Sequence, residues 1–295
     1  MANLKEVRTR IASVSSTQQI TSAMKMVSAA KFRRAQNAIT GMRPYTAQLQ
    51  EIINDIDTGD GISTPYHAQR PLHNVLLVVV TSNKGLCGAF NSNVIKQAQQ
   101  RIDHYRSSLP QDAALHVMSI GKKSSELLVR QKDLDLTTHD ELLDNPSFDA
   151  IAALADSIMT RFTDKQLDHV EVVYNQFKNS LSQILSTEQF LPIAPTATHT
   201  QQTESESHKS DYIFEPSKED ILREMVPLTL RSTFYRIVLD SLAAEHGARM
   251  TAMQKATDNA TELLKELRLS YNKARQAAIT NEIIEIVSGS EALKS

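Results

Sequence analysis

The feature that most constrains this chain is a stripe of apolar and small residues near its C-terminus, spaced three and four residues apart. The stripe consists of Met250, Met253, Thr257, Ala260, Leu264, Leu267, Tyr271, Ala274 and Ala278. This spacing is typical of the seam of a coiled coil. The helix around it is predicted to begin near Ser217 and to end near Val287. At about 1.5 Å per residue, roughly seventy residues form a rod of about 100 Å, too long for one domain of this size to bury.

A rod of this length needs a second long helix as its partner, and the segment from about Asn3 to Ile56 offers one. Its apolar stripe is expected to comprise Leu4, Val7, Ile11 and Val14 and, after a polar gap, Ile20, Met24 and Val27. A domain lies between the two helices in the sequence, so the helices should run antiparallel. We therefore expect the two ends of the chain to pair as a shaft.

The spacing of apolar residues changes in the middle of the chain. Val75–Val80 is a continuous apolar run, typical of a strand inside a parallel sheet. Further strands are predicted at Leu115–Ile120, Leu134–Thr138, Val170–Phe177 and Ile184–Pro192, with helices between the first four. This alternation indicates a Rossmann-like α/β domain with a mostly parallel sheet, in which the last two strands form an antiparallel edge hairpin.

The expected domain organisation follows from these segments. It comprises an N-terminal coiled-coil helix at 1–58, a central α/β domain at 70–195, an exposed loop rich in Thr, Ser, Glu and His at 196–216, and a C-terminal coiled-coil helix at 217–289.

Composition excludes several classes of protein. Cys87 is the only cysteine, so the chain can form neither an intrachain disulfide nor a multi-cysteine metal site, and a reducing compartment is expected. No apolar run is longer than that of Val75–Val80, which is too short to span a membrane, so membrane contact is expected only through partners. The first fifty residues carry eight basic residues and one acidic residue, Glu6, which favours an acidic partner.

The sequence offers no complete catalytic or cofactor motif. The loop Thr81–Asn91 follows a strand, where phosphate loops occur, but the spacing of Gly85 and Gly88 matches no nucleotide-binding fingerprint. Cys87 has no neighbouring base, and the nine histidines lack the spacing of metal ligands. The basic N-terminal helix lacks interleaved aromatic residues, which argues against nucleic-acid binding. We therefore expect no cofactor and no metal.

The C-terminal end is apolar on more than one helix face. Ile279, Ile283, Ile284, Ile286 and Val287 crowd this end, beyond the reach of the shorter N-terminal helix. The pattern fits an ordinary amphipathic core, but it also fits a rod tip that sits in a hole of another protein.

Four stretches of the sequence together resemble a known family, the gamma subunit of the bacterial rotary F-type ATP synthase. They are Thr17–Val27 with Ala29–Lys31 and Arg43-Pro44-Tyr45, then Gly85–Asn91, Glu245–Asn259 and Tyr271–Ser290. Chloroplast members of this family carry an inserted pair of cysteines that forms a thiol switch, whereas Cys87 stands alone here.

The resemblance implies a role as the central shaft of the ATP synthase. The shaft would stand inside a ring of three alpha and three beta subunits, and its foot would sit beside the epsilon subunit on the membrane c ring. It would transmit torque during proton-driven or sodium-driven ATP synthesis and have no catalytic site of its own. The implied location is peripheral, on the cytoplasmic face of the bacterial inner membrane.

The resemblance also implies roles for individual residues. Contacts with the beta subunits are implied for Met24, Lys25, Arg249, Gln276, Thr280 and Glu282. The bearing tip would consist of Ile283, Ile284, Ile286 and Val287, and the contact of the foot with the c ring of Tyr212, Phe214 and Glu215.

Two alternative functions stay open on sequence alone. A different coiled-coil adaptor with an α/β head fits the periodicity equally well but would not require the four matched stretches. A small α/β enzyme with helical extensions would require a complete cofactor loop or a base beside Cys87. Nucleotide binding by the isolated chain would distinguish the enzyme from the shaft.

Overall fold

A computed structural model describes residues 4–57, 64–110, 113–131, 134–179, 182–193 and 217–292. The chain divides into two compact units, one formed by Met1–Ala29 with Arg249–Ser295 and the other by Ala30–Ala248. Two long helices, α1 (Leu4–Asp57) and α5 (Lys218–Ala292), contribute to both units. Pro44 lies inside α1 and Pro227 inside α5, and neither ends its helix.

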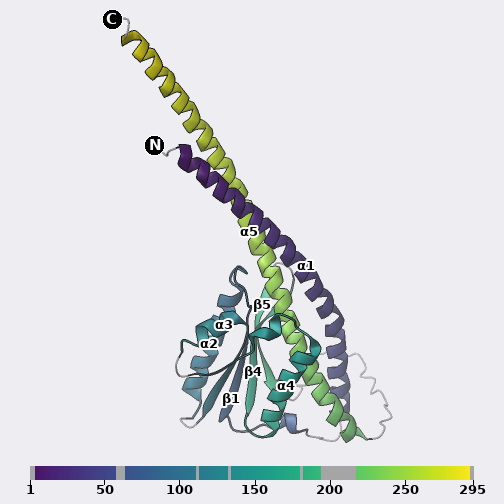
Figure 1. The fold of residues 1–295 in the computed structure, drawn as a ribbon. Helices are drawn as coiled ribbons and strands as arrows, with labels where there is room; N and C mark the ends of the chain where they lie inside the picture. The colour runs from purple at the N-terminus through teal and green to yellow at the C-terminus, as the bar shows by residue number, and fades with distance from the viewer. Residues whose placement is uncertain are drawn as a thin grey trace, which may run out of the picture. The chain divides into compact units, whose positions relative to one another are not determined.

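The larger unit contains a five-stranded sheet in the order β3-β2-β1-β4-β5 (Figure 1). The first four strands are parallel, and β5 runs antiparallel to β4 at the edge. The strands are β1 (Asn74–Val80), β2 (Ala114–Ile120), β3 (Asp135–Thr138), β4 (His169–Phe177) and β5 (Gln183–Leu191). Together with the two long terminal helices, this sheet confirms the predicted fold class, including the antiparallel edge hairpin.

Shorter helices precede the first strand and connect the strands that follow. They are the 3-10 turn η1 (Pro65–His67), α2 (Phe90–Ser108), α3 (Lys122–Leu128), the 3-10 turn η2 (Asp140–Leu143) and α4 (Phe148–Thr163). The helix α2 begins at Phe90, directly after the loop that follows β1. The Asn91 carboxamide does not cap the helix; it bonds back to Ser82 in the preceding loop. Ser147 caps the N-terminus of α4, because its hydroxyl accepts a hydrogen bond from the Ala150 amide.

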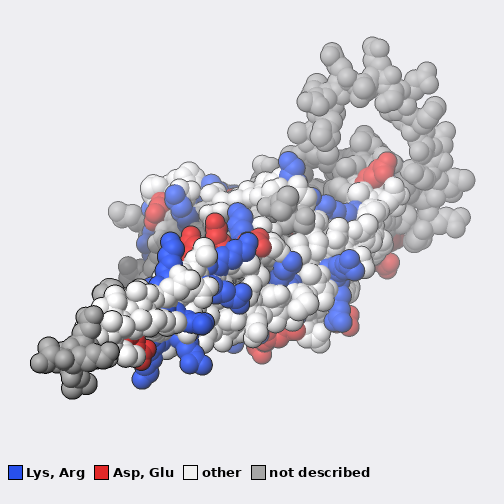
Figure 2. All heavy atoms as spheres, turned by 90° about the horizontal axis from the view of Figure 1, so that it is seen from above, with Lys and Arg blue, Asp and Glu red and all other residues white. Residues whose placement is uncertain are grey.

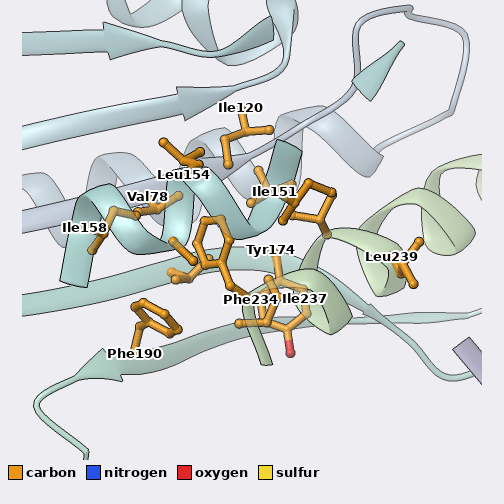
Figure 3. Close-up of a cluster of buried hydrophobic side chains, with 14 of the residues drawn as sticks. Val78, Ile120, Ile151, Leu154, Ile158, Tyr174, Phe190, Phe234, Ile237 and Leu239 are labelled. Carbon is orange, nitrogen blue, oxygen red and sulfur yellow. The ribbon is translucent and has the colours of Figure 1, made fainter. Parts of the chain in front are cut away.

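Side chains alternate across the sheet, so β1 contributes to two apolar clusters. Leu77 and Val79 pack with α2 on one face, around Val94, Ala98 and Ile102. Leu76, Val78 and Val80 face the other way, toward a larger cluster of side chains from α4, α5 and α1. Figure 3 shows the centre of this larger cluster, where Phe234 of α5 and Tyr174 of β4 lie among aliphatic side chains. The apolar run of β1 is completely buried, as expected for the strand at the centre of a sheet covered on both faces.

Candidate functional site

The unit formed by the chain ends is an antiparallel pair of helices whose register is set by two hydrogen bonds. The Gln18 side-chain amide donates to the Thr261 hydroxyl over 2.7 Å, and the Thr257 hydroxyl donates to the Thr21 hydroxyl over 2.8 Å. The residue number rises along α1 as it falls along α5, so the helices run in opposite directions, as predicted.

The α5 side of the seam is the predicted stripe. Met253, Ala260 and Leu264 are buried, and the stripe stays at least half-buried as far as Ala274. Ala278, which the sequence pattern includes, is exposed. The stripe therefore ends one turn earlier than predicted, because α1 begins at Leu4 and offers no further partner among the described residues.

The predicted α1 side of the seam is wrong at Ile20 and Val27, whereas Met24 is half-buried as the stripe requires. Ile20 and Val27 are 60% and 58% exposed, respectively, although the sequence stripe includes them. The heptad spacing of Leu4, Val7, Ile11 and Val14 instead continues through polar residues, and Ser28 is buried in the place expected for Val27. Gln18 and Thr21 form hydrogen bonds with Thr261 and Thr257 across the seam, whereas the Ser28 hydroxyl donates to the Met24 carbonyl of its own helix.

Beyond the seam, α5 continues alone as far as the structure describes it. Residues 275–290 are all exposed, and the four residues predicted to form the bearing tip are 53% to 66% exposed: Ile283, Ile284, Ile286 and Val287. The sequence allows two interpretations of these residues, an ordinary amphipathic core and a rod tip held by another protein. In the described part of the chain, they do not pack in a core. The result is an unpartnered apolar helix end.

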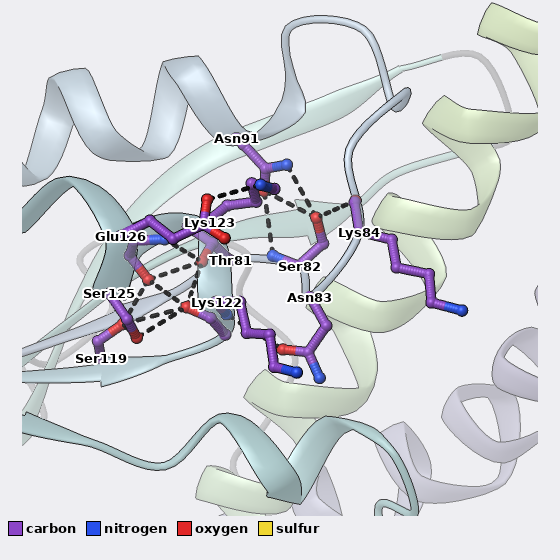
Figure 4. Close-up of polar contacts among 12 residues, drawn as sticks. Thr81, Ser82, Asn83, Lys84, Asn91, Ser119, Lys122, Lys123, Ser125 and Glu126 are labelled. Atoms are coloured by element: carbon purple, nitrogen blue, oxygen red, sulfur yellow. Dashed lines mark hydrogen bonds and ion pairs between the residues drawn. The ribbon is translucent and has the colours of Figure 1, made fainter.

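The loop after β1 is a tight turn closed by its own hydrogen bonds (Figure 4). The Ser82 amide donates to the Asn91 carboxamide oxygen over 3.0 Å, and the Ser82 hydroxyl donates to the Lys84 carbonyl over 2.8 Å. Cys87 is buried, with its sulfur 3.2 Å from the Asn91 amide nitrogen. The loop therefore has the features of a structural turn, as the sequence favours, and Cys87 has those of a buried thiol.

A neighbouring cluster of buried hydroxyl groups holds the turn after β2 against β1. The carbonyl of Gly121 accepts from the hydroxyls of Ser119, Ser124 and Ser125, and also from the hydroxyl of Thr81, which directly follows β1. Gly121 has a φ of +118°, and a Cβ there would lie 2.5 Å from the carbonyl oxygen of Thr81. Only glycine fits this close approach between the two strands.

Several titratable groups of the larger unit bind one another in structural pairs. Arg101 binds Glu171 with two hydrogen bonds of 2.8 and 2.7 Å, and the Tyr105 hydroxyl donates to the same carboxylate. Burial raises the pKa of Tyr105 to about 12. Burial also lowers the pKa of the neighbouring His169. Among the described residues, no three His, Cys, Asp or Glu side chains gather as they would around a metal ion. No helix in the same ranges has the length and hydropathy to cross a membrane.

Comparison with known proteins decides the family. A family model described as ATP synthase matches residues 3–293. The ATP synthase gamma chain of Flavobacterium johnsoniae is 52% identical over 295 residues, which are 99% of each chain. The chain belongs to the ATP synthase gamma chain family. This confirms the resemblance drawn from the four sequence stretches.

Solved structures of ATP synthases share the fold of this gamma chain family member. A chain in the central stalk and c-ring structure of the Tetrahymena thermophila mitochondrial enzyme is 25% identical, with a TM-score of 0.59, and the match covers 80% of this chain and 99% of that one. A chain in the Euglena gracilis mitochondrial F1 and c-ring structure has a TM-score of 0.68 at 21% identity, over 98% and 94% of the two chains.

The residues predicted to contact the beta subunits lie on both helices of the pair. Met24 and Lys25 are half-buried on α1, whereas Gln276, Thr280 and Glu282 are exposed on α5. The Thr280 hydroxyl donates to the Gln276 carbonyl one turn earlier. Their contacts with another subunit stay predictions.

Two groups of predicted contact residues are not among these exposed or half-buried positions. Arg249 is 7% exposed and so lies at the inner side of α5, unlike the other predicted contacts on that helix. Tyr212, Phe214 and Glu215, predicted to meet the c ring, lie outside the described residues, as does the loop predicted at 196–216.

The basic character of the N-terminal helix is present on its surface. Lys5, Arg8, Arg10, Lys31, Arg33 and Arg34 are all exposed on α1. In the view from above, basic side chains predominate over acidic ones (Figure 2). This member of the gamma chain family therefore presents positive charge to its surroundings along α1.

Proposed function

We propose that this chain is the central rotor shaft of an F-type ATP synthase and transmits torque between the membrane c ring and a catalytic hexamer of alpha and beta subunits. The observation that carries the proposal is the unpartnered apolar end of α5 in a gamma chain family member. An exposed apolar helix end is costly in water and is explained by a sleeve that encloses it. Apolar contacts lack the directional hydrogen bonds that would hold the tip at one angle, so they allow rotation within the sleeve.

The partners proposed are three alpha and three beta subunits around the helix pair, and the epsilon subunit with the c ring at the foot. The chain is proposed to be non-catalytic and to lie peripherally at the cytoplasmic face of a bacterial inner membrane. The exposed basic side chains of α1 suit a partner with an acidic segment. Exposed ion pairs contribute less than about 1 kcal/mol each, so such contacts could be broken and renewed as the shaft turns.

The domain division at 1–58, 70–195, 196–216 and 217–289 is proposed as the functional one. Limited proteolysis tests it, because cleavage should concentrate in 59–69 and 196–216, and protected fragments should match the intervening ranges. Preferential cleavage inside 70–195 would argue against these boundaries.

Reconstitution tests the proposed function. The chain is co-expressed with alpha and beta subunits of the same organism, and native mass and ATPase activity are measured with and without it. One copy per three alpha and three beta subunits, with activity that depends on the chain, is the expected result. A chain that stays alone and leaves the activity unchanged would favour the adaptor, whereas micromolar ATP affinity of the isolated chain would favour the enzyme.

The proposed beta contact of Glu282 has a matched control on the same helix. Glu282 and Glu262 are both exposed on α5. We expect Glu282→Lys to reduce chain-dependent ATPase activity by up to about fivefold, the effect of one surface ion pair. Glu262→Lys, outside the proposed contact, should leave it unchanged. Equal effects of the two substitutions would remove Glu282 from the contact.

A further inference from the structure

The motif Arg43-Pro44-Tyr45 marks the family but lies outside the helix pair of the chain ends. In the structure, one guanidinium nitrogen of Arg43 donates to the carbonyl of Phe177 over 2.7 Å and to the carboxylate of Asp240 over 2.6 Å. Phe177 is the last residue of β4, and Asp240 belongs to α5. A single side chain of α1 therefore binds both the central sheet and the other long helix.

Asp240 is the centre of this arrangement. Its side chain is completely buried, and a second cation, Arg236, lies 3.4 Å away one turn earlier on α5. Burial raises the pKa of Asp240, while the hydrogen bond and charge of Arg43 oppose that rise. A carboxylate that is removed from water in this way depends on its partners, so the position of α1 is tied to the charge of Asp240.

The same network continues to the edge of the sheet. Arg236 donates to the Glu188 carboxylate of β5 over 2.7 Å, and the Tyr174 hydroxyl of β4 donates to the other oxygen of Glu188 over 2.7 Å. Burial raises the pKa of Tyr174, so its hydroxyl keeps the proton that it donates. The ionic network thus joins α1, α5, β4 and β5 by directional bonds, all within the unit Ala30–Ala248.

The network lies beside an interruption in the backbone hydrogen bonds of α1. Pro44 has no amide hydrogen, so the carbonyl of Thr40 lacks its usual helical donor. Within the same unit, Phe32 and Ile39 of α1 make apolar contacts with the larger cluster. Apolar contacts resist separation but have no preferred direction, whereas charged hydrogen bonds fix position along and around a helix.

We propose that Arg43, Asp240, Arg236 and Glu188 form the joint through which torque passes between the α/β domain and the two long helices. The proposal rests on the proposed function and identifies these four as positioning residues of the shaft. It predicts that breaking the joint uncouples rotation of the foot from rotation of the helices, while the catalytic subunits continue to hydrolyse ATP.

The test uses the complete ATP synthase in membrane vesicles, with ATP hydrolysis and ATP-driven ion pumping measured in parallel. Arg43→Met should reduce the ions pumped per ATP by at least about threefold, because it leaves a buried carboxylate without its nearest cation. The matched control is Arg231→Met. Arg231 binds Asp156 over 2.6 Å in the same unit and is about as exposed as Arg43, 38% against 42%, but its partner Asp156 is 41% exposed whereas Asp240 is completely buried. An equal loss of coupling in the control would overturn the proposal.

A second comparison separates coupling from stability. The double variant Arg43→Met with Asp240→Leu removes the uncompensated charge, so it should recover thermal stability without recovering ions pumped per ATP. Recovery of coupling together with stability would reduce the network to a structural role and overturn the proposal. If Arg43→Met does not assemble, Glu188→Gln tests the other end, where a loss of coupling with hydrolysis retained is expected and normal coupling would refute the joint. Failure of the proposed function is distinct, since the wild-type chain would then support no pumping.

Discussion

Two adjacent leucines of α5 offer a stringent test of the helix pair. Leu264 is 5% exposed and lies in the seam, whereas Leu263 is 43% exposed. The register set by the Gln18–Thr261 and Thr21–Thr257 bonds places Val14 opposite Leu264. The substitution Leu264→Ala removes the same atoms as Leu263→Ala, but from the interior of the pair and not from its surface.

The expected cost follows from burial. Leucine-to-alanine changes at buried positions cost about 2–5 kcal/mol of stability. The cost at Leu264 should be about 2 kcal/mol, at the lower end of this range, because the two helices can partly close the cavity. The cost at Leu263 should be under about 1 kcal/mol, because much of that side chain already contacts water. Since about 1.4 kcal/mol corresponds to a factor of ten, Leu264→Ala should open the pair about 30-fold more often.

Hydrogen exchange of the amides around 257–268 in the isolated chain measures this opening directly. Leu264→Ala should accelerate exchange there by about 30-fold, and Leu263→Ala by less than about fivefold. If both variants exchange alike, or if Leu263→Ala has the larger effect, the assigned seam is wrong.

Three further predictions concern other parts of the chain. Gly121→Ala should lower the melting temperature by roughly 5–10 °C, because the new Cβ would introduce strain of about 3 kcal/mol. The control is Gly85→Ala, which should change the melting temperature little, since no atom lies within 4 Å of the new Cβ. Similar melting curves for the two variants would contradict the close approach at Gly121. Because burial lowers the pKa of His169, the unfolded chain binds the proton more readily, so stability should fall as the pH drops below about 6.5. His169→Gln should weaken this pH dependence in thermal melts at pH 5 and 8, and an unchanged dependence would exclude His169 as its source. Replacing Thr21 and Thr257 together by valine should stabilise the pair by about 1 kcal/mol, since it exchanges a hydrogen bond for apolar contact, and faster hydrogen exchange in the double variant would show that the bond contributes more.

The hydrophobic pattern alone was sufficient to predict the elements that bury apolar side chains. Val75–Val80 is a buried strand, and the spacing from Met253 to Leu264 marks a real seam, because in both cases burial and hydropathy coincide. The fold class follows from these elements and from the alternation of strands and helices between them.

The same reasoning failed where the interior is polar. Ile20 and Val27 were assigned to the seam because they are apolar, but the helix turns Gln18, Thr21 and Ser28 inward. Extending the regular spacing of Leu4 to Val14 would have found the true face. The hydrogen bonds that make a polar seam tolerable could not be found from one helix, since they depend on the register of two.

The contacts of Arg43 illustrate a second limit. The sequence identifies the motif as a mark of the family, but its partners Phe177 and Asp240 lie far along the chain. Nothing local to any of the three residues indicates that they meet. Arg249 is a related case, because a charged residue in a matched stretch was expected at a surface and is instead buried.

The unpartnered end of α5 affects how readily unassembled copies of this chain are degraded in the cell. Most of the stability of a helix in a protein comes from packing, and residues 275–290 have no neighbouring element in the described part of the chain. The end should therefore fray in free copies and present Arg275 and the following isoleucines to proteases, which cleave unfolded backbone. Enclosure would remove that vulnerability. Unassembled copies would thus be degraded, whereas assembled copies persist. The amount of the chain in the cell would therefore follow the number of complexes into which it can assemble.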